Sequence, residues 1–84
     1  MGIIQLRSIK SLRFDNTIGE VPEGFSQASF RNLGDNPATL TQNGNSWTLA
    51  KGEVFNIGNR KDEDAWMLVE VDASSTIVEC VYFK

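Results

Sequence analysis

The chain has 84 residues, of which 40% are hydrophobic, and a net charge of −3, so we expect one domain over residues 1–84. It contains no histidine, a single cysteine (Cys80) and no glycine-rich phosphate loop. These absences exclude an internal disulfide, leave a structural zinc site without a plausible ligand set and remove most catalytic designs. We therefore predict a protein that is not an enzyme, with no catalytic residue, no metal and no cofactor.

The small size of the domain favours a protein partner. A chain of this length buries only about 60–65% of the surface that its unfolded form exposes. Small folds gain stability from disulfides, metals or partners, and the first two are excluded here. We expect an oligomer or an assembly component, in contact with itself or with other proteins.

Charge is unevenly distributed along the chain. The basic residues near the start are Arg7, Lys10 and Arg13, and the acidic residues of the last third are Asp62, Glu63, Asp64, Glu70, Asp72 and Glu79. Phosphate binding needs clustered Lys and Arg, so we predict no nucleic acid partner. No apolar run approaches the roughly 20 residues that span a membrane, and the opening residues turn polar too early for a signal peptide. We expect no membrane contact, and the single unpaired cysteine favours synthesis in a reducing cytoplasm.

The first 24 residues are predicted to form a strand and a loop. In residues 3–14, the apolar positions 3, 6, 9 and 12 suit a helix, whereas 4, 6, 12 and 14 share one face of a strand. We favour a strand with a bulge or bend near Ser8 and Lys10. Residues 15–24 are rich in turn formers and include Pro22, which predicts a surface loop.

Residues 25–84 are predicted to form a core of β-hairpins. Residues 25–33 favour a strand, which turn chemistry ends at residues 34–37. Asn43-Gly44 is the preferred pair for a two-residue type I′ turn. This turn places Leu40 opposite Trp47 and Ala38 opposite Leu49, with only Ser and Thr on the other face. Turn chemistry and polarity therefore predict the same register. A second turn at Lys51-Gly52 precedes a strand at 53–57, and a charged loop follows at 58–64.

The last two strands are predicted to be residues 65–71 and 76–83, joined by a turn centred on Ala73-Ser74. This turn pairs Val71 with Thr76, Val69 with Val78, Met67 with Cys80 and Ala65 with Tyr82, which gives one apolar core face. The opposite face mixes apolar side chains with Glu70 and Glu79, and we predict that it is a protein interface. Its residues are Trp66, Leu68, Ile77, Val81 and Phe83. The alternative is a second core layer that the N-terminal segment covers.

Three other groups of residues could bind a ligand or react. Asp62-Glu63-Asp64 lacks the spacing of a calcium loop, which favours a solvated loop. Cys80 lies on the predicted core face, which favours an inert thiol. Trp47 is expected in the core, whereas Trp66 suits the core, a protein interface or a platform for stacking a sugar. The fold class that these elements define is all-β, a compact antiparallel sandwich or partly open barrel of six to seven short strands.

Four segments carry a family resemblance: Phe30-Arg31-Asn32-Leu33-Gly34, Ala38-Thr39-Leu40, Leu49-Ala50-Lys51-Gly52-Glu53-Val54-Phe55 and Val81-Tyr82-Phe83. The stretch resembles small β-structured virion proteins of tailed bacteriophages, in which Asn32, Gly34, Gly52 and Glu53 match structural turn residues. The resemblance implies a structural role in a phage particle, such as capsid decoration or a tail-associated protein. It also implies localisation in the virion after synthesis in the host cytoplasm. Similar patterns occur in carbohydrate-binding and adhesion β-sandwich modules, which is the alternative function.

Overall fold

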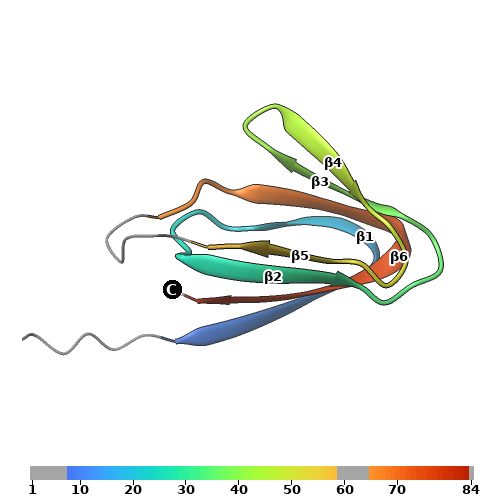
Figure 1. The fold of residues 1–84 in the computed structure, drawn as a ribbon, viewed down its shortest axis with the longest axis horizontal. Helices are drawn as coiled ribbons and strands as arrows, with labels where there is room; N and C mark the ends of the chain where they lie inside the picture. Colours follow the sequence, from blue (N-terminus) through green and yellow to red (C-terminus); the bar gives the residue numbers. More distant parts are fainter. Residues whose placement is uncertain (1–7, 59–64, 84) are drawn as a thin grey trace, which may run out of the picture.

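A computed structural model describes residues 8–58 and 65–83 of the chain and shows six strands in this part (Figure 1). The strands are β1 (Ile9–Val21), β2 (Gln27–Asn32), β3 (Ala38–Gln42), β4 (Asn45–Leu49), β5 (Val54–Ile57) and β6 (Val69–Phe83). Nothing in the described ranges is helical, so they hold no helix of the length and apolarity that crossing a membrane requires.

All six strands belong to one antiparallel sheet that curls into a half-barrel. Strand β6 pairs with β1 along one edge, and along its other edge with β3 and then with β2. The sheet therefore has two four-stranded halves that share β1 and β6. One half runs β4-β3-β6-β1 and the other runs β5-β2-β6-β1. The all-β fold and the antiparallel, partly open barrel are confirmed, although β1 and β6 are long strands.

Both long strands bend where one half of the sheet passes into the other. In β6 the buried positions are 69, 71 and 73 before the bend and 76, 78, 80 and 82 after it, with Ser74 and Ser75 exposed. The register of β1 against β6 shifts between Asp15 and Thr17, and Asn16 between them has a positive φ of 52°. A bulge of this kind bends the ladder without ending it. The core therefore lies inside the curl.

The predicted turn at Ala73-Ser74 is wrong, because residues 69–83 form one continuous strand. Val69 pairs with Val21 and Val78 pairs with Phe14, both on β1, instead of pairing with each other. The alternation of apolar residues changes phase at Ser74, and a turn and a bend produce the same change in the sequence. Asp72 Oδ1 accepts a hydrogen bond from the Ser74 backbone N–H at 3.1 Å at this bend. Hydrogen bonds from the side chain and backbone of Ser74 lower the pKa of Asp72.

The predicted loop over residues 15–24 is wrong for residues 15–21, because β1 continues to Val21. Positions 8–14 form strand from Ile9 onward, while residues 3–7 lie outside the described part. The register between Ile9 and Asp15 is regular, so the irregularity lies at Asn16 and not near Lys10. Within the described part of the N-terminal segment, residues 9–21 pair edge to edge with β6 and do not cover its outer face. Two turn-forming residues of this segment have other roles. Asn16 lies at the bulge, and Gly19 makes room for the ring of Phe14.

The turns predicted at Asn43-Gly44 and Lys51-Gly52 are confirmed, and Asn43, Gly44 and Gly52 have the positive φ angles that such turns require. Asn43 and Gly44 have φ values of 49° and 79°, and the β3–β4 register pairs Leu40 with Trp47 and Ala38 with Leu49. Gly52 has a φ of 77°, and Glu53 Oε1 accepts a hydrogen bond from the Ala50 backbone N–H at 2.7 Å. These turns direct β4 and β5 into opposite halves of the sheet.

The core is a single cluster on the inner face of the curl. Its buried residues are Phe14, Val21, Phe25, Ala28, Phe30, Ala38, Leu40, Leu49, Val69, Val71, Ala73, Val78, Cys80 and Tyr82. Met67, which the mistaken hairpin placed in this core, is 56% exposed. Trp47 and Trp66 are half-buried and pack against the cluster.

Asn32, at the end of β2, is the main buried polar residue that joins the two halves. Its side-chain amide donates to the carbonyl oxygens of Asn36 at 2.8 Å and Leu49 at 2.9 Å. Its Oδ1 accepts from the Gly34 backbone N–H at 3.0 Å and from the Thr76 hydroxyl at 2.8 Å. Every hydrogen-bonding group of this buried amide therefore has a partner, as burial of a polar side chain requires.

Candidate functional site

The outer face of the half formed by β5, β2, β6 and β1 exposes an apolar patch. The strand registers place Ile9 and Phe83 opposite each other on neighbouring strands, with Val81 two residues before Phe83. Ile9 is 71% exposed, and Val81 and Phe83 are each 36% exposed. We call Ile9, Val81 and Phe83 the outer patch. Backbone hydrogen bonding along β1 and β6 holds its three side chains on one face.

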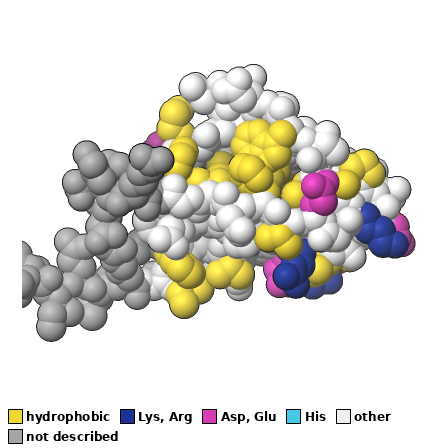
Figure 2. Space-filling model, viewed as in Figure 1, with side chains coloured by type: hydrophobic (Ala, Val, Ile, Leu, Met, Phe, Trp, Pro, Cys, Tyr) yellow, Lys and Arg dark blue, Asp and Glu magenta, His cyan; other side chains and the backbone are white. Residues whose placement is uncertain are grey.

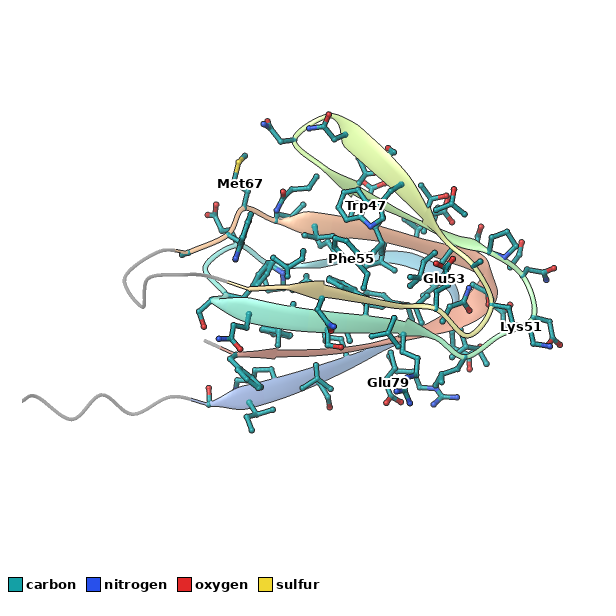
Figure 3. All side chains as sticks on the ribbon, in the orientation of Figure 1. Trp47, Lys51, Glu53, Phe55, Met67 and Glu79 are labelled. Atoms are coloured by element: carbon teal, nitrogen blue, oxygen red, sulfur yellow. The ribbon has the colours of Figure 1, made fainter. Side chains whose placement is uncertain are left out.

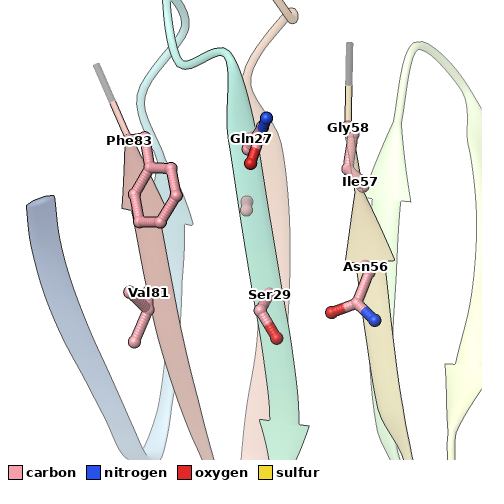
Figure 4. Close-up of a pocket in the computed structure, with 8 residues that line it drawn as sticks. Gln27, Ser29, Asn56, Ile57, Gly58, Val81 and Phe83 are labelled. Carbon is pink, nitrogen blue, oxygen red and sulfur yellow. The ribbon is translucent and has the colours of Figure 1, made fainter. Parts of the chain in front are cut away.

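A shallow groove lies beside the outer patch, with a volume of about 350 Å³ (Figure 4). It crosses the strands where small or polar side chains of neighbouring strands come into register, because Val81 pairs with Ser29 and Ser29 pairs with Asn56. Phe83 and Gln27 line one end. The groove is therefore shallow and open, with an apolar wall from Val81 and Phe83.

A row of charges crosses the same face next to the groove. Arg13 of β1 and Arg31 of β2 both stand in register with Glu79 of β6. The Arg13 guanidinium lies 3.6 Å from the Glu79 carboxylate, and both side chains are about half exposed. Exposed pairs of this kind add little stability, so the row is an exposed pattern of charge beside the groove.

The structure brings together three of the five residues predicted for the interface. Ile77, Val81 and Phe83 lie on this outer face of β6. Leu68 lies just before β6 begins at Val69 and belongs to no strand of the sheet, and Trp66 packs against the core. Ile9 was missed, because its partner strand could not be known from the sequence. The available signal in the sequence was that Ile9 does not fall on the strand face formed by positions 4, 6, 12 and 14.

A second hollow, the aromatic pocket, lies at the open side of the half-barrel between the β3–β4 hairpin and β5. Its volume is about 290 Å³, and it is lined by Gln42, Trp47, Phe55, Asn56, Ile57, Gly58 and Trp66. The rings of Trp47 and Phe55 lie with their centroids 4.9 Å apart and tilted by 49° (Figure 3). Apolar side chains are exposed over β5 and beside the hairpin in the space-filling view (Figure 2). The pocket lies between β4 and β5, the outer strands of the two halves, which do not pair with each other in the described part of the chain.

We next consider metal ligands and nucleophiles in the part of the chain that the structure describes. Across residues 8–58 and 65–83 there is no group of three or more Cys, Asp or Glu side chains placed to hold a metal ion. Cys80 is fully buried, and burial raises the pKa of its thiol to about 12. The thiolate that a nucleophile or metal ligand requires is therefore strongly disfavoured. The predicted solvated loop at Asp62-Glu63-Asp64 lies outside the described residues.

Comparison with known proteins supports the fold and no family. No family model and no curated protein matches the chain. Among solved structures, the chain is similar to the solution NMR structure of a de novo designed double-stranded beta-helix, with a TM-score of 0.55 and 14% sequence identity. The match covers 95% of this chain and 100% of that chain. At this identity the likeness defines the architecture alone, a double-stranded β-helix.

Proposed function

We propose that this protein is a non-enzymatic component of a protein assembly and that the outer patch is its contact surface. The observation that carries the proposal is the exposure of Ile9, Val81 and Phe83 together on neighbouring strands. Apolar side chains gathered beside a groove and flanked by charges are typical of an interface with an apolar centre and a polar rim. The resemblance to phage virion proteins makes a phage particle the proposed assembly, in a capsid-decorating or tail-associated position.

Burial of the outer patch would also supply stability to a small domain. An 84-residue chain buries a limited apolar core, so contact with a neighbour offsets part of the entropy cost of folding. Arg13, Glu79 and Arg31 then fix the orientation of the partner, because a shifted contact would place like charges opposite each other. The proposed partner surface is apolar at its centre and carries an acidic group for each of the two arginines.

Incorporation of variants into particles tests this proposal. The parent chain, Val81→Lys and Ile18→Lys would each be expressed with an affinity tag in the producing host during particle assembly. Ile18 is 58% exposed on β1 but pairs with Asp72, in the other half of the sheet, so it is the matched control. Mass spectrometry of purified particles should recover the parent and Ile18→Lys and lose Val81→Lys.

Thermal melts of the three purified chains should coincide within a few degrees, since each new lysine lies at an exposed position. The proposal fails if the parent chain is not recovered with particles, or if Val81→Lys is incorporated as well as the parent. Loss of Ile18→Lys together with Val81→Lys would also contradict it, because the contact would then not be confined to the outer patch.

A further inference from the structure

We infer that the aromatic pocket is a binding site for the ring of a neutral sugar. The inference does not depend on the assembly role, because the pocket lies on the open side of the half-barrel and shares none of the outer-patch residues. Three aromatic side chains, Trp47, Phe55 and Trp66, come from three separate segments to line one hollow. Flat aromatic faces of this kind bind the apolar C–H face of a sugar ring.

The walls of the pocket are held in place by hydrogen bonds and by packing. The Trp66 backbone pairs with Gly24 and Phe25, through bonds from Gly24 N to Trp66 O and from Trp66 N to Phe25 O, each 2.9 Å. Gln42 Nε2 donates to the Met67 carbonyl at 3.1 Å, which orients the amide at the rim. Trp47 packs on Phe55. The backbone around the pocket is therefore fixed before a ligand arrives, and only side chains need to move, which limits the entropy cost of binding.

The polar groups of the pocket favour a ligand with hydroxyl groups. The Nε1 atoms of Trp47 and Trp66 are buried and have no hydrogen-bond partner within the described structure. An unsatisfied buried donor is unfavourable, so a ligand oxygen that accepts from either indole relieves that cost. Neither nitrogen is open to solvent, and binding requires the rings to tip toward the ligand, a motion that partly exposed side chains make readily. The Gln42 and Asn56 amides add further donors and acceptors.

The charge of the lining residues decides between a neutral sugar and a quaternary ammonium group, which aromatic side chains also bind. An aromatic cage for a quaternary ammonium group works through cation–π attraction. None of the lining residues that the structure describes carries a negative charge, and an ammonium group cannot accept a hydrogen bond from an indole N–H. A purely apolar ligand would leave both N–H groups unsatisfied. The volume of about 290 Å³ lies at the small end of ligand sites, which suits one ring and not an extended chain.

Intrinsic fluorescence is a direct test, because the two tryptophans of the chain both line the pocket. The purified full chain would be titrated with the methyl glycosides of glucose, galactose, mannose and N-acetylglucosamine, and screened on a glycan array that presents other pyranoses. We expect a saturable change in tryptophan emission with at least one sugar, at a dissociation constant on the order of 1 mM or tighter. Tetramethylammonium chloride should give no such change.

Variants then locate the binding. Trp66→Phe and Trp47→Phe keep an aromatic ring and remove the indole N–H, and each should weaken binding roughly five- to tenfold. Leu68→Ala, near Trp66 in sequence but outside the lining, should bind as the parent does. The inference is overturned if no sugar in either screen binds, if the Phe variants bind as the parent does, or if tetramethylammonium alone changes the emission. If the emission changes with protein concentration and not with sugar concentration, a second copy of the chain occupies the pocket. That result would also overturn the inference.

Discussion

The Oδ1 atom of Asn32 accepts a hydrogen bond from the hydroxyl of Thr76 at 2.8 Å, and both residues are buried although 44 positions separate them. The contact joins the end of β2 to the bend of β6. It therefore connects the loop between the two halves of the sheet with the point where β6 passes from one half to the other.

Replacement of Asn32 by Ala should lower the free energy of unfolding by roughly 2–4 kcal/mol, because four hydrogen bonds are lost and several buried groups stay unsatisfied. Urea unfolding followed by fluorescence measures the change. Asn45→Ala makes the same chemical change at an exposed position and should stay within about 0.5 kcal/mol of the parent. Equal effects of the two substitutions would contradict the structural role of Asn32.

Gly34→Ala should be destabilising because the position has no room for a side chain. A Cβ atom there would collide with Thr76 Oγ1 and lie 2.7 Å from the backbone nitrogen of Ile77. Forcing extra volume into such a site costs typically about 1–3 kcal/mol. Gly58→Ala is the matched control, since a Cβ at Gly58 meets nothing within 4 Å and the backbone does not need a positive φ. Thermal melts in which Gly34→Ala equals the parent would rule out the close approach.

Gly44→Val should destabilise the protein by roughly 1–3 kcal/mol through backbone strain alone. Gly44 has a φ of 79°, which a β-branched residue adopts poorly, and a Cβ at this position meets no atom within 4 Å. Gly44→Asn separates strain from side-chain size, because asparagine tolerates positive φ and should cost much less. Circular dichroism melts compare the three chains. A valine variant that melts with the parent would show that the turn does not determine the β3–β4 register.

Stability should fall at alkaline pH because of Cys80. The folded protein keeps this thiol protonated to about pH 12, whereas the unfolded chain ionises it near its ordinary pKa of 9.0. The raised pKa therefore leaves stability intact below pH 9, and between pH 9 and pH 12 stability falls by about 1.4 kcal/mol per pH unit from this group.

Urea unfolding of the parent and Cys80→Ala over this pH range measures the effect of the thiol, since the other titrating groups are common to both chains. Cys80→Ala should be less stable at neutral pH, because it leaves a small cavity, but its stability should decline less steeply above pH 9. Parallel curves for the two chains would mean that the thiol ionises in the folded state.

Local residue patterns were enough to predict much of the fold. Asn43-Gly44 required a particular turn, and the alternation of Leu40, Trp47 and Leu49 required the same register, so both could be derived within 12 residues of sequence. The strands at β2 and β5 and the burial of Cys80 followed from polarity in the same way. These features depend on contacts between neighbours in sequence or on the two-residue period of a strand, which the sequence contains in full.

The tertiary structure decided how the long strands run and which residues meet. Ser74 and Ser75 change the phase of β6, and the sequence does not distinguish a turn from a bend, because only pairing with β1 keeps the strand continuous. That pairing placed Ile9 beside Phe83 and separated Trp66 from Val81. The curl of the sheet brought Trp47 and Trp66 to one pocket, and the pairing of β2 with β6 gave Asn32 its distant partner Thr76. Each of these contacts forms between segments far apart in the chain, and they form because curling the sheet buries its apolar face, a gain that no local segment achieves alone.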